Sequence, residues 1–348
     1  MKLSLDQLIS NLLNGLDSRS KNIMKRRFNL TQNGSSETLA SLGKELNVTR
    51  ERIRQIEAQS LSKVNGLINN GAGREFFDAI KERLNYFGGV RRMHDLAQDL
   101  AFQFAKGGTS SQLFVNQVRF LVEAAGSPAY AQENSNFHAM WYVNRESLEK
   151  SRAFCKALKE ILEKKKSEVL EQGGWHGMFA GTLKTHKLSE YIGLNFLATS
   201  KNFAVNPYGD FGLSHWPYIK PKTMRDKAYL VLRKENKPLH FEHIAERINM
   251  MSFDRKTAHP PTVHNELIRD KRFVLVGRGI YALKEQGYFP GTARETLVRL
   301  LSNKGPMDRN SIMDLVLSER FLKPNTIFLN LQNRKYFKRL NDGRYTLA

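Results

Sequence analysis

The sequence predicts a mainly α-helical fold with small β-wings, organised as tandem helix-turn-helix and winged-helix modules. Two observations lead to this prediction. In the first seventy residues, apolar positions recur at helical spacing and are separated by short polar turns. Near the C-terminus, helices followed by a glycine-containing hairpin occur twice, and matched residues such as Tyr281 and Tyr345 are 64 positions apart. One structural unit has therefore been used twice.

The N-terminal segment is expected to be entirely helical. The expected helices cover residues 5–16, 20–28 and 39–46 and a longer segment from Arg50, with a polar turn over 31–36. The last two helices are separated by only a few residues, which is the outline of a helix-turn-helix.

Three residues of that turn have a physical reason to be there. Gly43 lets the two helices approach closely, Asn47 tolerates a left-handed backbone, and Thr49 can cap the following helix. Helical spacing then directs one set of side chains to the core, namely Val48, Ile53, Ile56 and Val64. The outward set is Arg50, Glu51, Arg54 and Gln55.

These residues also carry a resemblance. Residues 16–30, 38–46 and the eleven-residue run 48–58 resemble region 4 of primary bacterial sigma factors. In that family, region 4 binds the upstream promoter hexamer and the flap of RNA polymerase. The resemblance implies that Arg50, Glu51 and Gln55 contact base edges and that Arg54 contacts the neighbouring DNA backbone, with Thr49 and Arg52 completing the predicted DNA-binding set. It also implies that the helices over 20–46 dock on the polymerase.

The side-chain chemistry of the outward set agrees with base reading. Arginine can form two hydrogen bonds with guanine, glutamate can accept one from cytosine, and glutamine can pair with adenine. The alternative is an ordinary solvated helix face with alternating charges. The position at the start of a recognition helix favours DNA contact.

The middle of the chain has a looser pattern. Gly88-Gly89-Val90, helices over 93–104 and 113–124 and an apolar stretch over 137–143 follow the winged-helix order. A long basic helix over 145–172 is expected to act as a spacer or scaffold. A short helix over 188–196 and a hairpin with its turn at 206–210 complete this part.

The two C-terminal copies each predict three helices and a two-stranded wing. The first helices cover 224–233 and 293–302, each is followed by a proline-containing turn, and glycines at 279 and 343 serve the hairpins. The run Phe273–Leu283 makes the first copy resemble the HARE-type winged helix, which occurs in the RNA polymerase delta subunit and in some chromatin and restriction proteins. Tyr281 and Tyr345 are expected to pack the wings against the helices.

Basic residues of the third helices and wings are candidate phosphate contacts. They are Arg269, Lys271, Arg272, Arg278, Lys335 and Arg344, with Arg334, Lys338 and Arg339 beside them. Ordinary surface solvation is an equal alternative, because winged helices also serve as protein-binding modules.

Length and composition fit a chain of several small modules. The 348 residues are 41% hydrophobic and 26% charged, as in globular domains. We expect a helix-turn-helix over 1–72, a winged-helix-like module over 73–146, the long helix with a helix-hairpin module over 147–220, a HARE-type winged helix over 221–288 and a second winged helix over 289–348.

The charge balance indicates a polyanionic partner. There are 55 Lys and Arg against 34 Asp and Glu, a net charge of +21, and the basic residues are dispersed along the chain. Double-stranded DNA is therefore the expected partner. No run of 18 apolar residues and no signal-peptide pattern is present, so we expect no membrane segment and no export. One cysteine, Cys155, fits a reducing cytoplasm, with the protein on the nucleoid.

Residues suited to catalysis or metal binding are few. His240 and His243 have a helical spacing, but no acidic partner is placed beside them, and Glu163 with Lys165 copies only the tail of a nuclease motif. A phosphate-binding glycine loop and a nucleophile elbow are both absent from the sequence. We therefore expect no enzyme activity, no cofactor, no metal and no small-molecule substrate, and Cys155 is interpreted as a small buried residue.

The sequence as a whole predicts a sigma-like, sequence-specific DNA-binding transcription factor that contacts RNA polymerase. Two alternatives remain at this point. Because HARE-type domains accompany restriction nucleases, the chain could target DNA for a catalytic partner. It could also be an accessory subunit of the polymerase.

Overall fold

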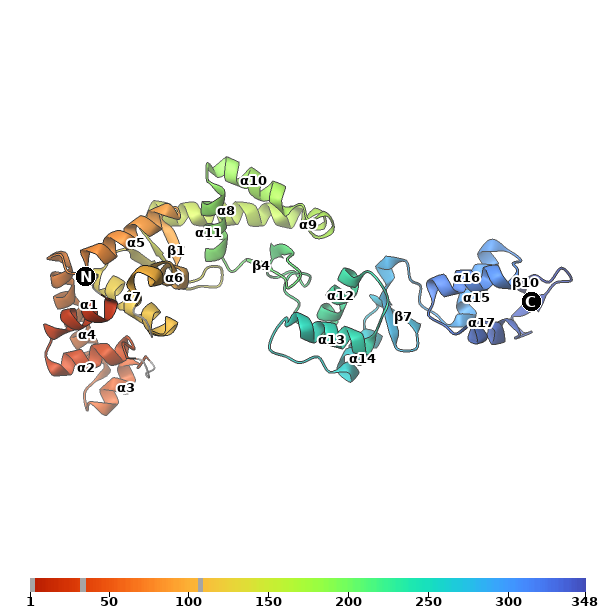
Figure 1. The fold of residues 1–348 in the computed structure, drawn as a ribbon, viewed down its shortest axis with the longest axis horizontal. Coiled ribbons are helices and arrows are strands. Elements are labelled where there is room, and N and C mark those ends of the chain that lie inside the picture. The colour runs from red at the N-terminus through yellow and green to blue at the C-terminus, as the bar shows by residue number, and fades with distance from the viewer. Residues whose placement is uncertain (1–3, 32–35, 106–108) are drawn as a thin grey trace. The chain divides into compact units, whose positions relative to one another are not determined.

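The computed structural model describes residues 4–31, 36–105 and 109–348, so most of the polar turn expected over 31–36 lies outside the described residues. The chain divides into an N-terminal unit, residues 1–203, and a C-terminal unit, residues 204–348. Helices dominate both units, and the strands form small antiparallel sheets (Figure 1). The predicted mainly α fold with small β-wings is confirmed.

The N-terminal unit begins with the four expected helices. They are α1 (Leu5–Asn14), α2 (Ser18–Arg27), α3 (Leu39–Glu45) and α4 (Arg50–Asn69). Each starts at a polar residue whose side chain accepts a hydrogen bond from the first helical turn: Ser4, Asp17, Thr38 and Thr49. Such caps satisfy backbone N–H groups that have no partner within the helix.

The next six elements have the order of a winged helix. They are α5 (Arg74–Tyr86), β1 (Val90–Arg92), α6 (Met93–Phe104), α7 (Ser111–Ala125), β2 (Ala129–Ala131) and β3 (Met140–Tyr142), with the sheet order β1-β3-β2. Helices α6 and α7 and strand β3 occur where the sequence predicts helices and an apolar stretch. The sequence reasoning did not identify α5 or β2.

One hydrophobic core joins α5, α6, α7 and β3 of this group to α1, α2 and α4. It extends from Leu5 in α1 to Trp141 in β3, and the rings of Phe28 and Phe120 meet edge to face with their centroids 5.2 Å apart. Helix α7 packs against α1 and α4 and buries nine of its fifteen residues. The boundary expected between residues 72 and 73 therefore falls inside one shared core.

The long helix expected over 145–172 is two helices, which corrects that prediction. Helix α8 (Arg145–Lys164) ends at Lys165, whose φ of −112° and ψ of 31° leave helical geometry, and α9 (Lys166–Gln172) follows. Helix α8 buries Phe154, Cys155 and Leu158 against α10 (Trp175–His186) and α11 (Glu190–Thr199). Of the two expected roles, the packing supports the scaffold.

A small hairpin, β4 (Phe203–Val205) and β5 (Phe211–Leu213), crosses from one unit to the next in sequence. Its turn is at residues 206–210 as predicted, and the side-chain oxygen of Asn206 accepts hydrogen bonds from the backbone N–H groups of Tyr208 and Asp210 at 2.9 and 3.0 Å. The first compact unit ends at residue 203 in the sequence, so the module expected over 147–220 is divided between the two units.

The C-terminal unit contains the two predicted copies, here called the first repeat (residues 223–288) and the second repeat (residues 289–348). The first repeat consists of α12 (Met224–Glu235), β6 (Leu239–His240), α13 (Phe241–Met251), α14 (Pro260–Arg269), β7 (Phe273–Gly277), β8 (Ile280–Leu283) and a short 3-10 helix (Lys284–Gln286). Its sheet has the order β6-β8-β7, which matches the order β1-β3-β2 of the N-terminal unit.

The second repeat has the same plan in a shorter form. It consists of α15 (Ala293–Lys304), α16 (Arg309–Glu319), α17 (Pro324–Leu331), β9 (Phe337–Arg339) and β10 (Tyr345–Leu347). Met307 bridges Tyr345 where the first repeat pairs Leu239 with Tyr281, so a bridge replaces the first strand. Tyr281 and Tyr345 are both buried, as predicted, at 3% and 9% exposure.

Candidate nucleic-acid interface

The turn between α3 and α4 is as tight as the sequence predicts. A Cβ atom on Gly43 would lie 2.8 Å from the carbonyl oxygen of Val48 and 3.3 Å from the backbone nitrogen of Arg50. Asn47 has a φ of 52°, in the left-handed region that asparagine tolerates better than most residues. These two residues fix the angle at which α4 leaves the turn.

Thr49 then sets the first residue of α4. Its side-chain oxygen accepts a hydrogen bond from the backbone N–H of Arg52 at 3.1 Å. Ile53 and Ile56 anchor the helix in a small core with Ile23 of α2 and Leu42 of α3. Burial of this face leaves the opposite face of the first two helical turns open to solvent.

The open face carries the predicted DNA-binding residues. Arg50, Glu51, Arg52, Arg54 and Gln55 are all exposed. The Arg54 guanidinium pairs with the Glu51 carboxylate at 2.7 Å and lowers the pKa of that carboxyl, and Arg52 donates to the side-chain oxygen of Gln55 at 3.3 Å. Exposed pairs of this kind are weak because water screens them, so their members can exchange these partners for DNA groups at little cost.

Two basic residues of α2 hold the helix-turn-helix together, and sequence reasoning did not single them out. Arg26 bonds Glu37 at 2.5 Å and also pairs with Glu45 of α3, while Arg27 bonds Glu57 of α4 at 3.2 Å. All of these partners are distant in sequence, and no local spacing indicates them. Ion pairs across three helices give α4 a fixed support.

The candidate phosphate contacts of the first repeat differ from one another in their surroundings. Arg269, Lys271 and Arg278 are exposed. Arg272 instead bonds Asp270 at 2.7 Å and Asp226 at 3.1 Å, and its guanidinium lies 4.8 Å from the centre of the Tyr229 ring. Two carboxylates already neutralise Arg272, so the structure favours a role in joining the wing to α12 over the predicted phosphate contact.

The candidate contacts of the second repeat are exposed without exception. They are Lys335 and Arg344, together with Arg334, Lys338 and Arg339. Arg344 pairs with Asp342 at 2.6 Å on the surface of the hairpin turn.

No cluster suited to metal chemistry is found in the described part of the chain. The rings of His240 and His243 are 6.2 Å apart, and His240 packs on Phe241. Across the described ranges, no three His, Cys, Asp or Glu residues are grouped to hold a metal ion. Burial raises the pKa of the Cys155 thiol to about 12, which agrees with a small buried residue. None of the described helices combines the length and apolarity needed to cross a bilayer.

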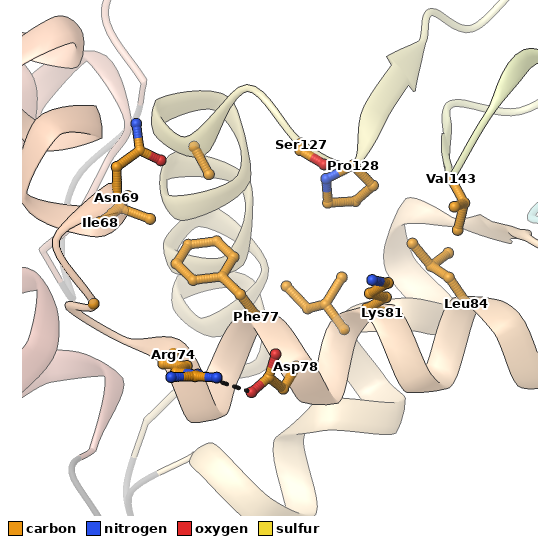
Figure 2. A pocket seen from close by; sticks show the side chains of 13 residues that line it. Ile68, Asn69, Arg74, Phe77, Asp78, Lys81, Leu84, Ser127, Pro128 and Val143 are labelled. Atoms are coloured by element: carbon orange, nitrogen blue, oxygen red, sulfur yellow. Dashed lines mark ion pairs between the residues drawn. The ribbon is translucent and has the colours of Figure 1, made fainter.

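A cavity of about 650 Å³ lies between the end of α4, α5 and the end of α7 (Figure 2). Phe77, Ile80 and Leu84 of α5 form an apolar wall, and Arg74 and Asp78 form an ion pair of 3.8 Å at the rim. The charged side chains of the lining are Arg74, Asp78 and Lys81.

The geometry of α2, α3 and α4 is that of a helix-turn-helix whose second helix is exposed at its N-terminal end. Comparison with known proteins gives the class: residues 12–65 match the family described as Sigma-70, region 4. Residues 12–65 are thus a region 4 domain, as the sequence predicts.

Individual relatives match over the same part of the chain. They include the RNA polymerase sigma factor RpoD of Helicobacter pylori strain ATCC 700392 (44% identical over 64 residues, 18% of this chain and 10% of the relative) and SigA of Clostridium acetobutylicum (49% over 59 residues, 17% and 15%). RpoD of Neisseria gonorrhoeae is 34% identical over 84 residues, 24% of this chain and 13% of the relative. The chain therefore spans no more than about a seventh of the length of these relatives.

Proposed function

We propose that this protein is a sigma-like, sequence-specific DNA-binding transcription factor without enzyme activity of its own. In this proposal, α4 enters the major groove of promoter-type DNA. Arg50, Glu51 and Gln55 read base edges, and Arg54 contacts the backbone beside them. The observation that carries the proposal is the exposure of these side chains at the start of α4, within a segment that matches region 4.

The base-reading role is tested by selecting DNA sites from a random pool with the full chain. Glu51→Ala and Gln55→Ala should each change the preferred sequence, because each removes a base contact that is worth about 1–3 kcal/mol. Arg54→Glu should weaken binding to all duplexes. Lys63→Ala, an exposed change later in α4, is the matched control and should leave the selected site unchanged. Selection of the parent site by the Glu51 and Gln55 variants would reject the role.

The second part of the proposal is a contact with bacterial RNA polymerase through α2 and α3. Support comes from the region 4 match, which includes both helices. The full chain should bind purified core polymerase in a nuclease-treated mixture, where DNA cannot bridge the two proteins. If no binding is seen, only the DNA-binding half of the proposal stands.

A further inference from the structure

The two C-terminal repeats use the same surface of their wings in different ways. In the first repeat, Phe273, Tyr281 and Leu283 face the helices, whereas Val274, Val276 and Ala282 form a separate apolar cluster with Ile280. This second cluster is here called the outer wing face. Adding the repeat offset of 64 gives the equivalent residues of the second repeat: Lys338, Leu340, Thr346 and Arg344.

In the first repeat, the wing carries the junction with the second repeat. The backbone N–H of Phe321 donates to the carbonyl oxygen of Val276 at 2.8 Å, and Gly277 and Phe321 form a parallel bridge. A Cβ atom on Gly277 would lie 2.7 Å from the carbonyl oxygen of Phe321. Val274 and Val276 are 2% and 0% exposed. This wing is therefore already occupied by protein.

Arg320 forms hydrogen bonds to both repeats at this junction. It is 5% exposed, and its guanidinium donates to the carbonyl oxygens of Leu275 at 3.0 Å and Phe289 at 2.9 Å and to the hydroxyl oxygen of Thr296 at 2.8 Å. Arg320 thus bonds the wing of the first repeat and two parts of the second repeat, namely Phe289 and the first helix, α15.

In the second repeat, two of the four equivalent positions are basic and exposed. Lys338 stands where the first repeat has Val274, and Arg344 where it has Ile280. At the side of the wing nearer the third helix, Arg339 replaces Leu275 and Arg334 replaces Asp270. All four cations are exposed. The surface that joins repeats in one copy has become a charged surface in the other.

Three of these cations converge on one groove. Arg334, Lys338 and Arg339 line a cavity of about 670 Å³ between the end of α17 and β9, and its lining contains no carboxylate. The aromatic rings beside it are packed inward, since Phe337 is 2% and Tyr345 9% exposed. A site for single-stranded nucleic acid would need exposed rings for base stacking, whereas phosphates need only the cations.

We propose that this basic surface, made of Arg334, Lys338, Arg339 and Arg344, binds the phosphate backbone of double-stranded DNA. It adds a second, sequence-independent DNA contact to the proposed function and rests on that function only for the choice of DNA as the polyanion. The first wing takes no part, because it holds the second repeat. Of the two repeats, the second therefore supplies the DNA contact.

The test compares two full-length triple variants on a random-sequence duplex over a range of salt concentrations. Arg334→Gln, Lys338→Gln and Arg339→Gln together should weaken binding and make log K fall less steeply with log salt, by about 0.9 for each phosphate that is no longer neutralised. The comparison variant removes three exposed cations from the first repeat, Arg269→Gln, Lys271→Gln and Arg278→Gln, and should change the slope less than the second-repeat variant does. Circular dichroism and the unfolding midpoint establish that each variant is folded, and Lys338→Gln alone gives a smaller change of the same sign if the triple variant unfolds.

Three results would overturn the proposal. An unchanged slope for the second-repeat variant would assign the surface to an acidic protein partner. An equal loss of salt dependence in both variants would show that the effect comes from overall charge and not from this surface. If loss of these cations weakened binding to single-stranded DNA more than binding to duplex DNA, the duplex would be excluded as the ligand of this surface. The proposed base reading by α4 fails independently, since its test is a change of selected sequence and not of salt slope.

Discussion

At the residue scale, the packing of α3 on α4 requires a glycine at position 43, where there is no room for a Cβ atom. Its missing Cβ leaves room for the carbonyl oxygen of Val48, which belongs to the backbone and cannot turn aside as a side chain would. Any larger residue must push α3 away from α4. The orientation of the exposed face of α4 therefore depends on this glycine, although Gly43 itself has no role in contacting DNA.

Gly43→Ala is expected to lower the free energy of unfolding of the N-terminal unit by about 1–3 kcal/mol, the usual cost of overpacking. Gly66→Ala is the matched control, because a Cβ atom there meets nothing within 4 Å. Alanine is favoured over glycine inside a helix, so this variant should gain roughly 0.5–1 kcal/mol. Thermal and urea unfolding followed by circular dichroism measure both. An equal effect of the two variants would contradict the packing argument.

What sequence can predict at this scale depends on how local the cause is. Gly43, Asn47 and Thr49 were identifiable because each satisfies a backbone requirement within a few residues. The ion pair of Arg272 with Asp226 could not be predicted in this way, because the two residues are 46 positions apart in sequence. The ion pairs of Arg26 and Arg27 could not be predicted for the same reason, because their partners are distant in sequence.

At the scale of elements, α7 has the place of a recognition helix but not its exposure. It is the third helix of the winged-helix order in the N-terminal unit, and it is buried against α1 and α4. The helical spacing of its apolar residues was enough to predict a helix, but it did not show which elements the helix packs against. Helix α7 therefore packs against α4 of the region 4 domain.

A fragment of residues 1–72 is expected to lose most of its helical structure, because Leu8, Leu12 and Phe28 would lose the core that α5, α6 and α7 provide. A fragment of residues 1–203 keeps that core and should unfold cooperatively. Circular dichroism and size-exclusion chromatography distinguish the two. A monomeric 1–72 fragment with a cooperative transition would show that the shared core is dispensable.

Helix α10 was missed because its local signal is weak, whereas α5 was missed although Phe76, Ile80 and Leu84 recur at helical spacing. Helix α10 contains Gly177 and Gly181, which usually argue against a helix, and it forms because Met178 and Phe179 pack on α8. The reverse holds at Lys165, where the charged pattern continues without interruption although the helix breaks. Tertiary packing decides both cases, and no window of sequence contains it.

At the scale of the whole molecule, the net charge of +21 is not shared evenly. Residues 73–146 contain eight basic and eight acidic residues, whereas residues 289–348 contain eleven basic and five acidic. The excess of positive charge is thus absent from residues 73–146. Residues 221–288 contain fourteen basic and eight acidic residues, an excess equal to that of residues 289–348, so net charge does not distinguish the two repeats.

Arg320→Ala is expected to uncouple the two repeats. The exchange leaves buried carbonyl oxygens of Leu275 and Phe289 without their donor, at a cost of about 1–3 kcal/mol for each unsatisfied group. Proteolysis within residues 284–292 should become faster, and the C-terminal unit should unfold in two steps. Lys323→Ala, an exposed neighbour, is the control and should behave as the parent. Unchanged proteolysis of the Arg320 variant would locate the junction elsewhere.

The charges on the second wing also bear on contacts between molecules. An exposed apolar face like that of Val274 and Val276 would offer a surface on which another molecule could dock, and head-to-tail contacts of this kind do not close but grow into fibres. The second repeat has the exposed cations Lys338 and Arg344 at the positions equivalent to Val274 and Ile280. Because like charges repel, the cations that are proposed to bind DNA also oppose docking of one such wing on another.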